Sequence, residues 1–126
     1  MPEKTAAEKM RLKAGLTAAI LHAPGGVVEG LGIPAGVAVV DDPIGADFVL
    51  EFATGQAEVE ARLAALKPHL TAATLLWLAY PKGAKAAGRD VSRDTIWAFA
   101  QSIGLRLVAN VAIDDTWSAL RVRPAG

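Results

Sequence analysis

Basic side chains gather in one short segment, and they are the residues of this sequence best suited to hold a charged molecule. Lys82 and Lys85 follow a strongly apolar run, and Arg89 and Arg93 precede the next amphipathic stretch. In open α/β sheets, ligands usually bind at the corner between a strand and the next helix, because free N–H groups there favour negative charge. The spacing therefore predicts an anion-binding loop over residues 82–93, suited to a phosphate or a carboxylate.

The same cations have a simpler interpretation. Arg89 and Arg93 alternate with Asp90 and Asp94, and exposed pairs of this kind contribute little while their carboxylates suit a helix N-terminus. Asp114 lies in a predicted hairpin turn, where aspartate is common, yet it could support the site by pairing with a loop arginine if the hairpin folds back. The sequence leaves both interpretations open, with Asp94 and Asp114 as the supporting residues.

No other residues have the spacing of a reactive centre. The chain has no cysteine, which excludes disulfides, thiol nucleophiles and thiolate metal sites. His22 and His69 have no second histidine nearby, so no metal site is predicted. The serines lack the G-x-S-x-G pattern, and Pro24-Gly25-Gly26 does not match G-x-G-x-x-G, so it is predicted to be a tight turn. No cofactor is predicted.

Length and charge limit the classes of function. The 126 residues suffice for one domain, and the formal net charge is zero. Residues 14–66 carry one basic and seven acidic groups, whereas residues 67–126 carry eight basic and four acidic ones. Zero net charge argues against nonspecific nucleic-acid binding. Without a signal core or a run of about 20 apolar residues, no membrane partner is predicted and the location is expected to be cytoplasmic.

Apolar runs and their boundaries predict the elements that must position these residues. Helices are expected over residues 27–31 and 54–67, and a third begins after Asp90 or Ser92 and stops at Gly104. Trp77, Trp97 and Trp117 are expected to be core residues, because tryptophan buries much apolar area. Strands are expected over residues 17–22, 37–40, 46–53, 73–80, 106–113 and 117–123.

The order of these elements predicts the fold. Alternating strands and helices followed by two strands around Asp114-Asp115-Thr116 indicate a single-domain, Rossmann-like three-layer α/β sandwich. The sheet is expected to be mostly parallel with a C-terminal antiparallel hairpin. The linker between the second and third strands is too short for a helical crossover, so these strands are antiparallel or not adjacent. Residues 1–13 are assigned as a helical or flexible extension, and residues 14–126 as the domain.

Three motifs carry a resemblance to a known family. The sequences Ala79-Tyr80-Pro81-Lys82, Arg93-Asp94-x-x-Trp97 and the run from Ala112 to Arg121 resemble a family of small uncharacterised bacterial proteins, a domain of unknown function. The resemblance covers nearly the whole chain and is most distinctive at the C-terminus. It implies one compact domain and no particular reaction.

Two functions are consistent with these patterns. The preferred one is a non-catalytic binding or protein-interaction module, not an enzyme, that holds an anionic small molecule or a protein partner and allows a homodimer. The alternative is a small enzyme, a transferase or hydrolase acting on a phosphorylated or carboxylated small molecule, with Asp94 or Asp114 as base and Lys82 or Arg93 stabilising charge. The first is preferred because no nucleophile, metal or cofactor motif is visible.

Overall fold

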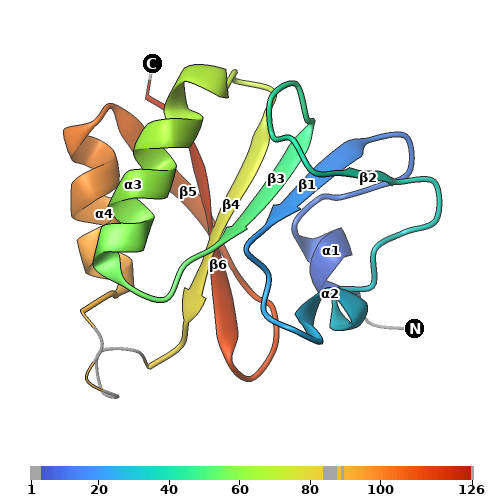
Figure 1. Ribbon diagram of the computed structural model, residues 1–126, viewed down its shortest axis with the longest axis horizontal. Coiled ribbons are helices and arrows are strands. Elements are labelled where there is room, and N and C mark those ends of the chain that lie inside the picture. Colours follow the sequence, from blue (N-terminus) through green and yellow to red (C-terminus); the bar gives the residue numbers. More distant parts are fainter. Residues whose placement is uncertain (1–3, 84–87, 89, 126) are drawn as a thin grey trace.

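Six strands form one twisted sheet at the centre of the molecule. The computed structural model describes residues 4–83, 88 and 90–125, and Figure 1 shows the sheet between two helical layers. The order across the sheet is β2-β1-β3-β4-β6-β5. The strands are β1 (Thr17–Leu21), β2 (Ala38–Val40), β3 (Phe48–Phe52), β4 (Leu75–Pro81), β5 (Leu105–Ala112) and β6 (Trp117–Pro124).

Strand direction divides the sheet into two parts. β2, β1, β3 and β4 are parallel, and β6 lies antiparallel between β4 and β5. The chain passes from β1 to β2 on one side and places β3 on the other side of β1. The order of the strands therefore reverses between β1 and β3, and in open α/β sheets the crevice at such a reversal is the usual ligand site.

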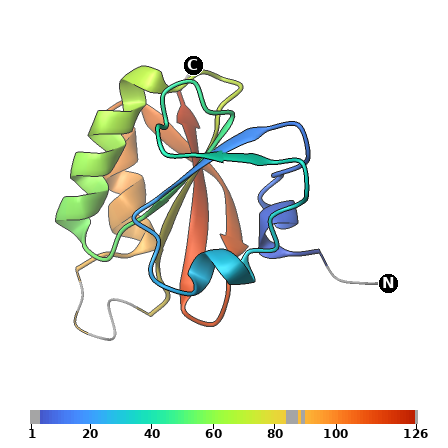
Figure 2. The same ribbon diagram turned by 45° about the vertical axis from the view of Figure 1, so that its right-hand side comes forward.

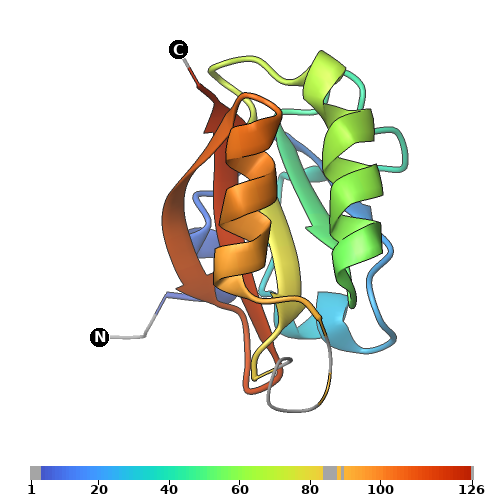
Figure 3. The same ribbon diagram turned by 90° about the vertical axis from the view of Figure 1, so that its left-hand side faces the viewer.

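Two helices cover one face of the sheet because each has one apolar side. Val59, Leu63 and Leu66 of α3 (Gln56–Leu66) are buried, and each contributes about 1.5–3 kcal/mol. The 3₁₀ turn η1 (Lys67–His69) follows α3 and precedes β4. Ser92 caps α4 (Arg93–Ser102) by accepting a hydrogen bond from Thr95 N. Figure 3 shows α3 and α4 side by side on this face.

The opposite face has a thinner cover. It holds only α1 (Ala6–Lys9) and α2 (Val27–Gly30) among the described helices, and both are short. Figure 2 shows α1 and α2 on the other side of the sheet from α3 and α4. Trp77 of β4 fixes the end of α1, because its buried Nε1 donates to the Met10 carbonyl oxygen at 3.0 Å. This face of the sheet is therefore covered by backbone turns as much as by helices.

A close approach locks α1 against the loop that follows α2. Gly32 has φ +71°, and a Cβ added there would come within 2.4 Å of the Thr5 side chain. Ala7 N also donates to the Leu31 carbonyl oxygen at 2.9 Å. Only glycine satisfies both the backbone angle and the contact at position 32.

The predicted fold class is confirmed. The sheet is mostly parallel with an antiparallel end, and β2 and β3 are not adjacent because β1 lies between them. Of the two residues expected to begin the last helix, Ser92 is confirmed as its N-cap, whereas Asp90 accepts from Gln56 N at 2.9 Å and so caps α3. The predicted start of α3 at residue 54 was wrong, because Gly55 is its N-cap.

No described helix is both long and apolar enough to cross a membrane.

Candidate functional site

A histidine and a glutamate meet where the order of the strands reverses. His22 follows the last residue of β1, and Glu51 is the fourth residue of β3, paired in register with Leu21. His22 Nδ1 lies 2.6 Å from Glu51 Oε2. The two residues are 29 positions apart in the sequence, and only the parallel pairing of β1 with β3 brings them together.

Burial sets the protonation behaviour of the carboxyl group. Only 3% of the Glu51 side chain is exposed. Burial raises the pKa of Glu51 above its usual range, because desolvation outweighs the lowering effects of the His22 hydrogen bond and of the His22 and Arg62 charges. A buried carboxylate without partners would be costly, and the imidazole is the partner that satisfies it here.

His22 has the opposite environment. Its side chain is 57% exposed, and within the described part of the chain its Nε2 has no hydrogen-bond partner. When the carboxylate is ionised and the imidazole is neutral, Nδ1–H donates to Glu51, so the lone pair resides on Nε2. A buried carboxylate that fixes the tautomer of an exposed imidazole is the arrangement of a general base.

The backbone at His22 is held in an unfavourable conformation. Its φ is +59°, in the left-handed region that non-glycine residues avoid at a cost of about 1–2 kcal/mol. The turn places the imidazole beside Glu51, on the face of the sheet that α3 covers. Strain of this kind persists where the surrounding structure fixes it, and it concentrates at functional sites.

An arginine from α3 braces the end of β3. Arg62 Nη1 donates to the Phe52 carbonyl oxygen and lies 3.4 Å from Glu58 Oε1. Glu58 in turn accepts from Thr54 N at 2.8 Å, and this backbone hydrogen bond is the main reason that the pKa of Glu58 is lowered. These contacts fix the peptide after Glu51, so the carboxyl group has little freedom to turn away from His22.

The predicted anion loop is only partly described. Lys85 and Arg89 lie outside the described residues. Lys82 is exposed directly after β4, and its backbone N donates to the Thr116 carbonyl oxygen at 2.7 Å. Arg93 and Asp94 are exposed in the first turn of α4. The anion site on this loop stays a prediction.

Asp114 has a structural role in the hairpin turn. Its Oδ1 accepts from Thr116 N at 2.8 Å and from Trp117 N at 2.7 Å. No described ion pair joins Asp114 to an arginine. The observed hydrogen bonds match the turn interpretation of this residue.

The tryptophans differ from one another in burial. Trp77 and Trp117 are core residues as predicted, with 1% and 7% exposure. The prediction was wrong for Trp97, which is 49% exposed on α4, four residues after Arg93. A helix of ten residues with a single buried face leaves its remaining positions in solvent, whatever their size.

Sequence reasoning missed the His22–Glu51 pair, although one signal was present. Glu51 is a single charged residue inside the apolar stretch from Phe48 to Phe52, where a charge needs a partner. His22 has no neighbouring histidine, so its spacing gives no sign of a metal site. Within the described part of the chain, no group of three or more histidines and carboxylates could hold a metal ion.

Comparisons by sequence yield no relatives: no protein-family model matches the chain, and no curated protein matches it. Solved structures do match by shape. An O-methyltransferase of neocarzinostatin biosynthesis, in complex with S-adenosylmethionine, matches with a TM-score of 0.61 and 13% identity; the match covers 91% of this chain and 50% of that one. The chain therefore spans half the length of that enzyme.

Two further matches are proteins of RNA metabolism. The Methanococcus jannaschii fibrillarin pre-rRNA processing protein matches with a TM-score of 0.58 and 11% identity, over 91% of this chain and 69% of that one. The B. subtilis tRNA methyltransferase TrmK matches with a TM-score of 0.52 and 14% identity, over 98% and 67%. At such identities the likeness establishes the Rossmann-like fold that methyltransferases use.

These neighbours correct the preferred function. The sequence favoured a non-catalytic module and argued against an enzyme, but methyltransferases recur among the structures of the same fold. The expectation of a non-catalytic module was wrong, and the alternative of a small enzyme is the one that the comparisons favour. A site built from residues far apart in the chain leaves no motif within a short stretch of sequence.

Proposed function

We propose that this chain is a small transferase of the methyltransferase type, whose reaction takes place at the carboxyl ends of β1 and β3. The observation that carries the proposal is the 2.6 Å contact between His22 Nδ1 and Glu51 Oε2 at the reversal of strand order. This is the edge at which open α/β sheets bind their ligands. The methyltransferases among the structural neighbours support the reaction class.

Proton transfer is the part of the reaction that this chain's residues would perform. His22 Nε2 would take the proton of a substrate hydroxyl or amine as that group becomes a nucleophile. Glu51 would hold the Nδ1 proton and stabilise the imidazolium that forms. Arg62 would keep the end of β3 in place through the Phe52 carbonyl oxygen.

S-adenosylmethionine, the cofactor named with the O-methyltransferase, supplies an electrophilic methyl group and carries a positive sulfonium. The residues near the carboxyl end of β1 fit one part of this cofactor. Segment 14–66, with seven acidic groups and one basic group, favours a cation. A Cβ built on Gly25 or Gly26 meets nothing within 4 Å, so space lies open beside this backbone, just after His22. Gly25 and Gly26 would hold the amino-acid part against their backbone.

The ribose part fits less well. In nucleotide-binding Rossmann folds an acidic residue after the second strand binds the ribose. Asp42 does not suit this role, because it lines a hollow with Thr17, which begins β1 and so lies at the opposite end of that strand from His22. The Asp42 side chain also accepts from Ile44 N at 2.9 Å. Asp41, exposed directly after β2, is the remaining carboxylate for it.

A pair of glycine variants tests the cofactor directly. Gly25→Val has open space around its Cβ and no positive φ, so it should fold and fill the proposed cradle. Gly30→Ala, also with open space around its Cβ, is the matched control on α2. We expect S-adenosylmethionine and S-adenosylhomocysteine to bind the wild type and Gly30→Ala in calorimetric titration and to raise their unfolding temperatures. Neither molecule should bind or stabilise Gly25→Val. Lack of binding to the wild type at millimolar concentration contradicts the cofactor assignment.

Methyl transfer itself is tested with a radiolabelled methyl donor. Phenols and amines would be offered as acceptors, and label transferred to either of them by the wild type and not by His22→Asn supports the proposal. Equal transfer by both proteins excludes His22 as the base.

A further inference from the structure

Arginines line the thinly covered face of the sheet, on the opposite side from α3 and α4. Arg121 and Arg123 are two apart in β6, so both point to the face on which Ala119 packs with Trp77. Arg106 of β5 is the cross-strand partner of Arg123, and partners of this kind share a face. Together with Arg11 we call these residues the arginine face: Arg11, Arg106, Arg121 and Arg123.

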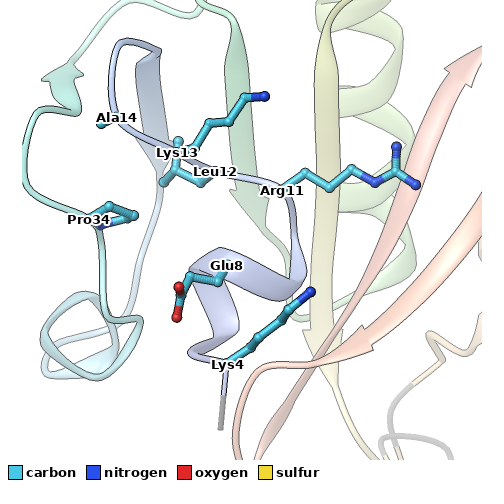
Figure 4. Close-up of a pocket in the computed structure, with 7 residues that line it drawn as sticks. All are labelled: Lys4, Glu8, Arg11, Leu12, Lys13, Ala14 and Pro34. Atoms are coloured by element: carbon cyan, nitrogen blue, oxygen red, sulfur yellow. The ribbon is translucent and has the colours of Figure 1, made fainter. Parts of the chain in front are cut away.

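Arg11 comes from a different segment and is directed toward the strands. It follows α1 with φ +70°, a conformation that usually calls for glycine after a helix. The Trp77 hydrogen bond to the Met10 carbonyl oxygen holds the preceding residue against β4. Figure 4 shows the Arg11 guanidinium extending toward the strands and the Lys4 ammonium on the same side of α1.

The arginine face contains no compensating carboxylate among the described ion pairs, which are His22–Glu51 and Arg62–Glu58. Glu8, the acidic residue of the adjoining hollow, accepts from Thr5 N at 2.9 Å and points away from Arg11 in Figure 4. Within the described chain, the buried Nε of Arg121 has no hydrogen-bond partner. Arg121 is the cross-strand partner of Trp77, whose Nε1 donates to the carbonyl oxygen of the residue before Arg11, so the two arginines lie on the same part of this face. The pKa of Arg121 is lowered, first by burial and then by the positive charges of Arg11 and Arg123.

We propose that the arginine face is a second ligand site, which binds a small phosphorylated or carboxylated molecule through Arg11, Arg121 and Arg123. Guanidinium groups hold phosphate and carboxylate oxygens in paired hydrogen bonds, and such a ligand would satisfy the buried Arg121 Nε. A hollow of about 450 Å³ adjoins Arg11 and has the size of small-molecule sites; its lining includes three cations, Lys4, Arg11 and Lys13, and one carboxylate, Glu8.

The surroundings favour a small anion over a nucleic acid. Single-stranded nucleic acids need exposed aromatic rings for stacking, and Trp77 and Trp117 near this face are buried. Trp97, which is exposed, lies on α4 in the opposite layer. The zero net charge of the chain points the same way.

Pyrophosphate is the test ligand, with inorganic phosphate and malonate as smaller phosphate and dicarboxylate probes. Titration calorimetry at constant ionic strength should show pyrophosphate binding to the full chain. Arg121→Met should weaken it at least tenfold while unfolding at the same or a higher temperature, since the variant removes an unpaired buried group. Arg11→Gly should also weaken pyrophosphate binding, and it is the test variant if Arg121→Met does not fold.

Lys67→Met, which removes an exposed cation at the end of α3, is the matched control and should bind pyrophosphate as the wild type does. Unchanged affinity in folded Arg121→Met or in Arg11→Gly overturns the proposal, as does an equal loss in Lys67→Met. Binding of S-adenosylmethionine should not change in Arg121→Met, so failure of this site and failure of the proposed function give different results.

Discussion

The two candidate sites differ in whether their buried charged group has a partner within the protein. At the strand reversal, the buried Glu51 has His22 as its partner, and the peptide after it is fixed by Arg62. On the arginine face, Arg121 has a buried nitrogen without a described partner and two cations nearby. A charge that is paired inside the protein is suited to moving a proton, whereas one left unpaired is suited to binding a charge from outside.

Both sites share one backbone feature. His22 and Arg11 are the only non-glycine residues with positive φ within the described part of the chain. Each follows a short element, β1 or α1, and each directs a polar side chain toward one face of the sheet. Strain of about 1–2 kcal/mol at each residue is tolerated where the neighbouring contacts hold it, as the Trp77 hydrogen bond does beside Arg11.

The largest expected effect concerns catalysis at the strand reversal. His22→Asn keeps a residue type that tolerates left-handed φ and removes the imidazole. We expect its transfer rate to fall by about 10²–10⁴, the usual contribution of a general base, with little change in pyrophosphate binding. The measurement is transfer of label from S-adenosylmethionine, with His69→Asn as control. A rate within a factor of three of the wild type, roughly 0.7 kcal/mol, contradicts the role of His22.

The next effect concerns the packing beneath the arginine face. Trp77→Phe removes the indole N–H and leaves the Met10 carbonyl oxygen without its buried donor. The free energy of unfolding should fall by about 1–3 kcal/mol in denaturant titration, and pyrophosphate affinity should fall with it. Trp97→Phe, half exposed on α4, should cost less than about 0.5 kcal/mol. Equal costs for the two variants would show that the Trp77 contact contributes little.

Stability should also depend on pH through Glu51. Because burial raises its pKa in the folded protein, the group stabilises the fold at low pH, and this contribution is lost as pH rises through the folded pKa. Glu51→Gln lacks this titration and can still accept from Nδ1. Its stability relative to the wild type should therefore increase from acid to neutral pH, by about 1.4 kcal/mol for each pKa unit. A pH-independent difference in unfolding free energy would contradict the assigned direction.

The smallest effect separates backbone strain from charge. Arg11→Gly relieves the positive φ and should raise the free energy of unfolding by up to about 1 kcal/mol, while it weakens pyrophosphate binding. Lys9→Gly, in the helical residue two positions earlier, should lower stability by about 0.5–1 kcal/mol. If both variants are destabilised alike in thermal unfolding, the left-handed residue is not strained.

Much of the fold followed from local patterns. The apolar run before Pro81 gave β4, the spacing of Val59, Leu63 and Leu66 gave the buried side of α3, and the polar turn at Asp114 gave the antiparallel hairpin. These features depend on neighbours within a few residues, so periodicity and turn chemistry predict them. Trp97 was misplaced because residue type alone does not fix which side of a helix faces the sheet.

The two candidate sites could not be predicted from local patterns in this way. Glu51 and His22 are 29 residues apart, and the cations of the arginine face come from the turn after α1, from β5 and from β6. The sequence showed the cations of the 82–93 loop because they are neighbours along the chain. It could not show residues that become neighbours only when β1 pairs with β3 and β6 inserts between β4 and β5.

The sequence by itself determined most of the elements and the class of fold, because these follow from hydrophobic period, glycine and proline positions and helix caps. The tertiary structure alone decided the strand order, and with it which polar groups share a site. The reason is physical: strand register sets which side chains meet, and burial then sets their charge, as in the raised pKa of Glu51 beside His22.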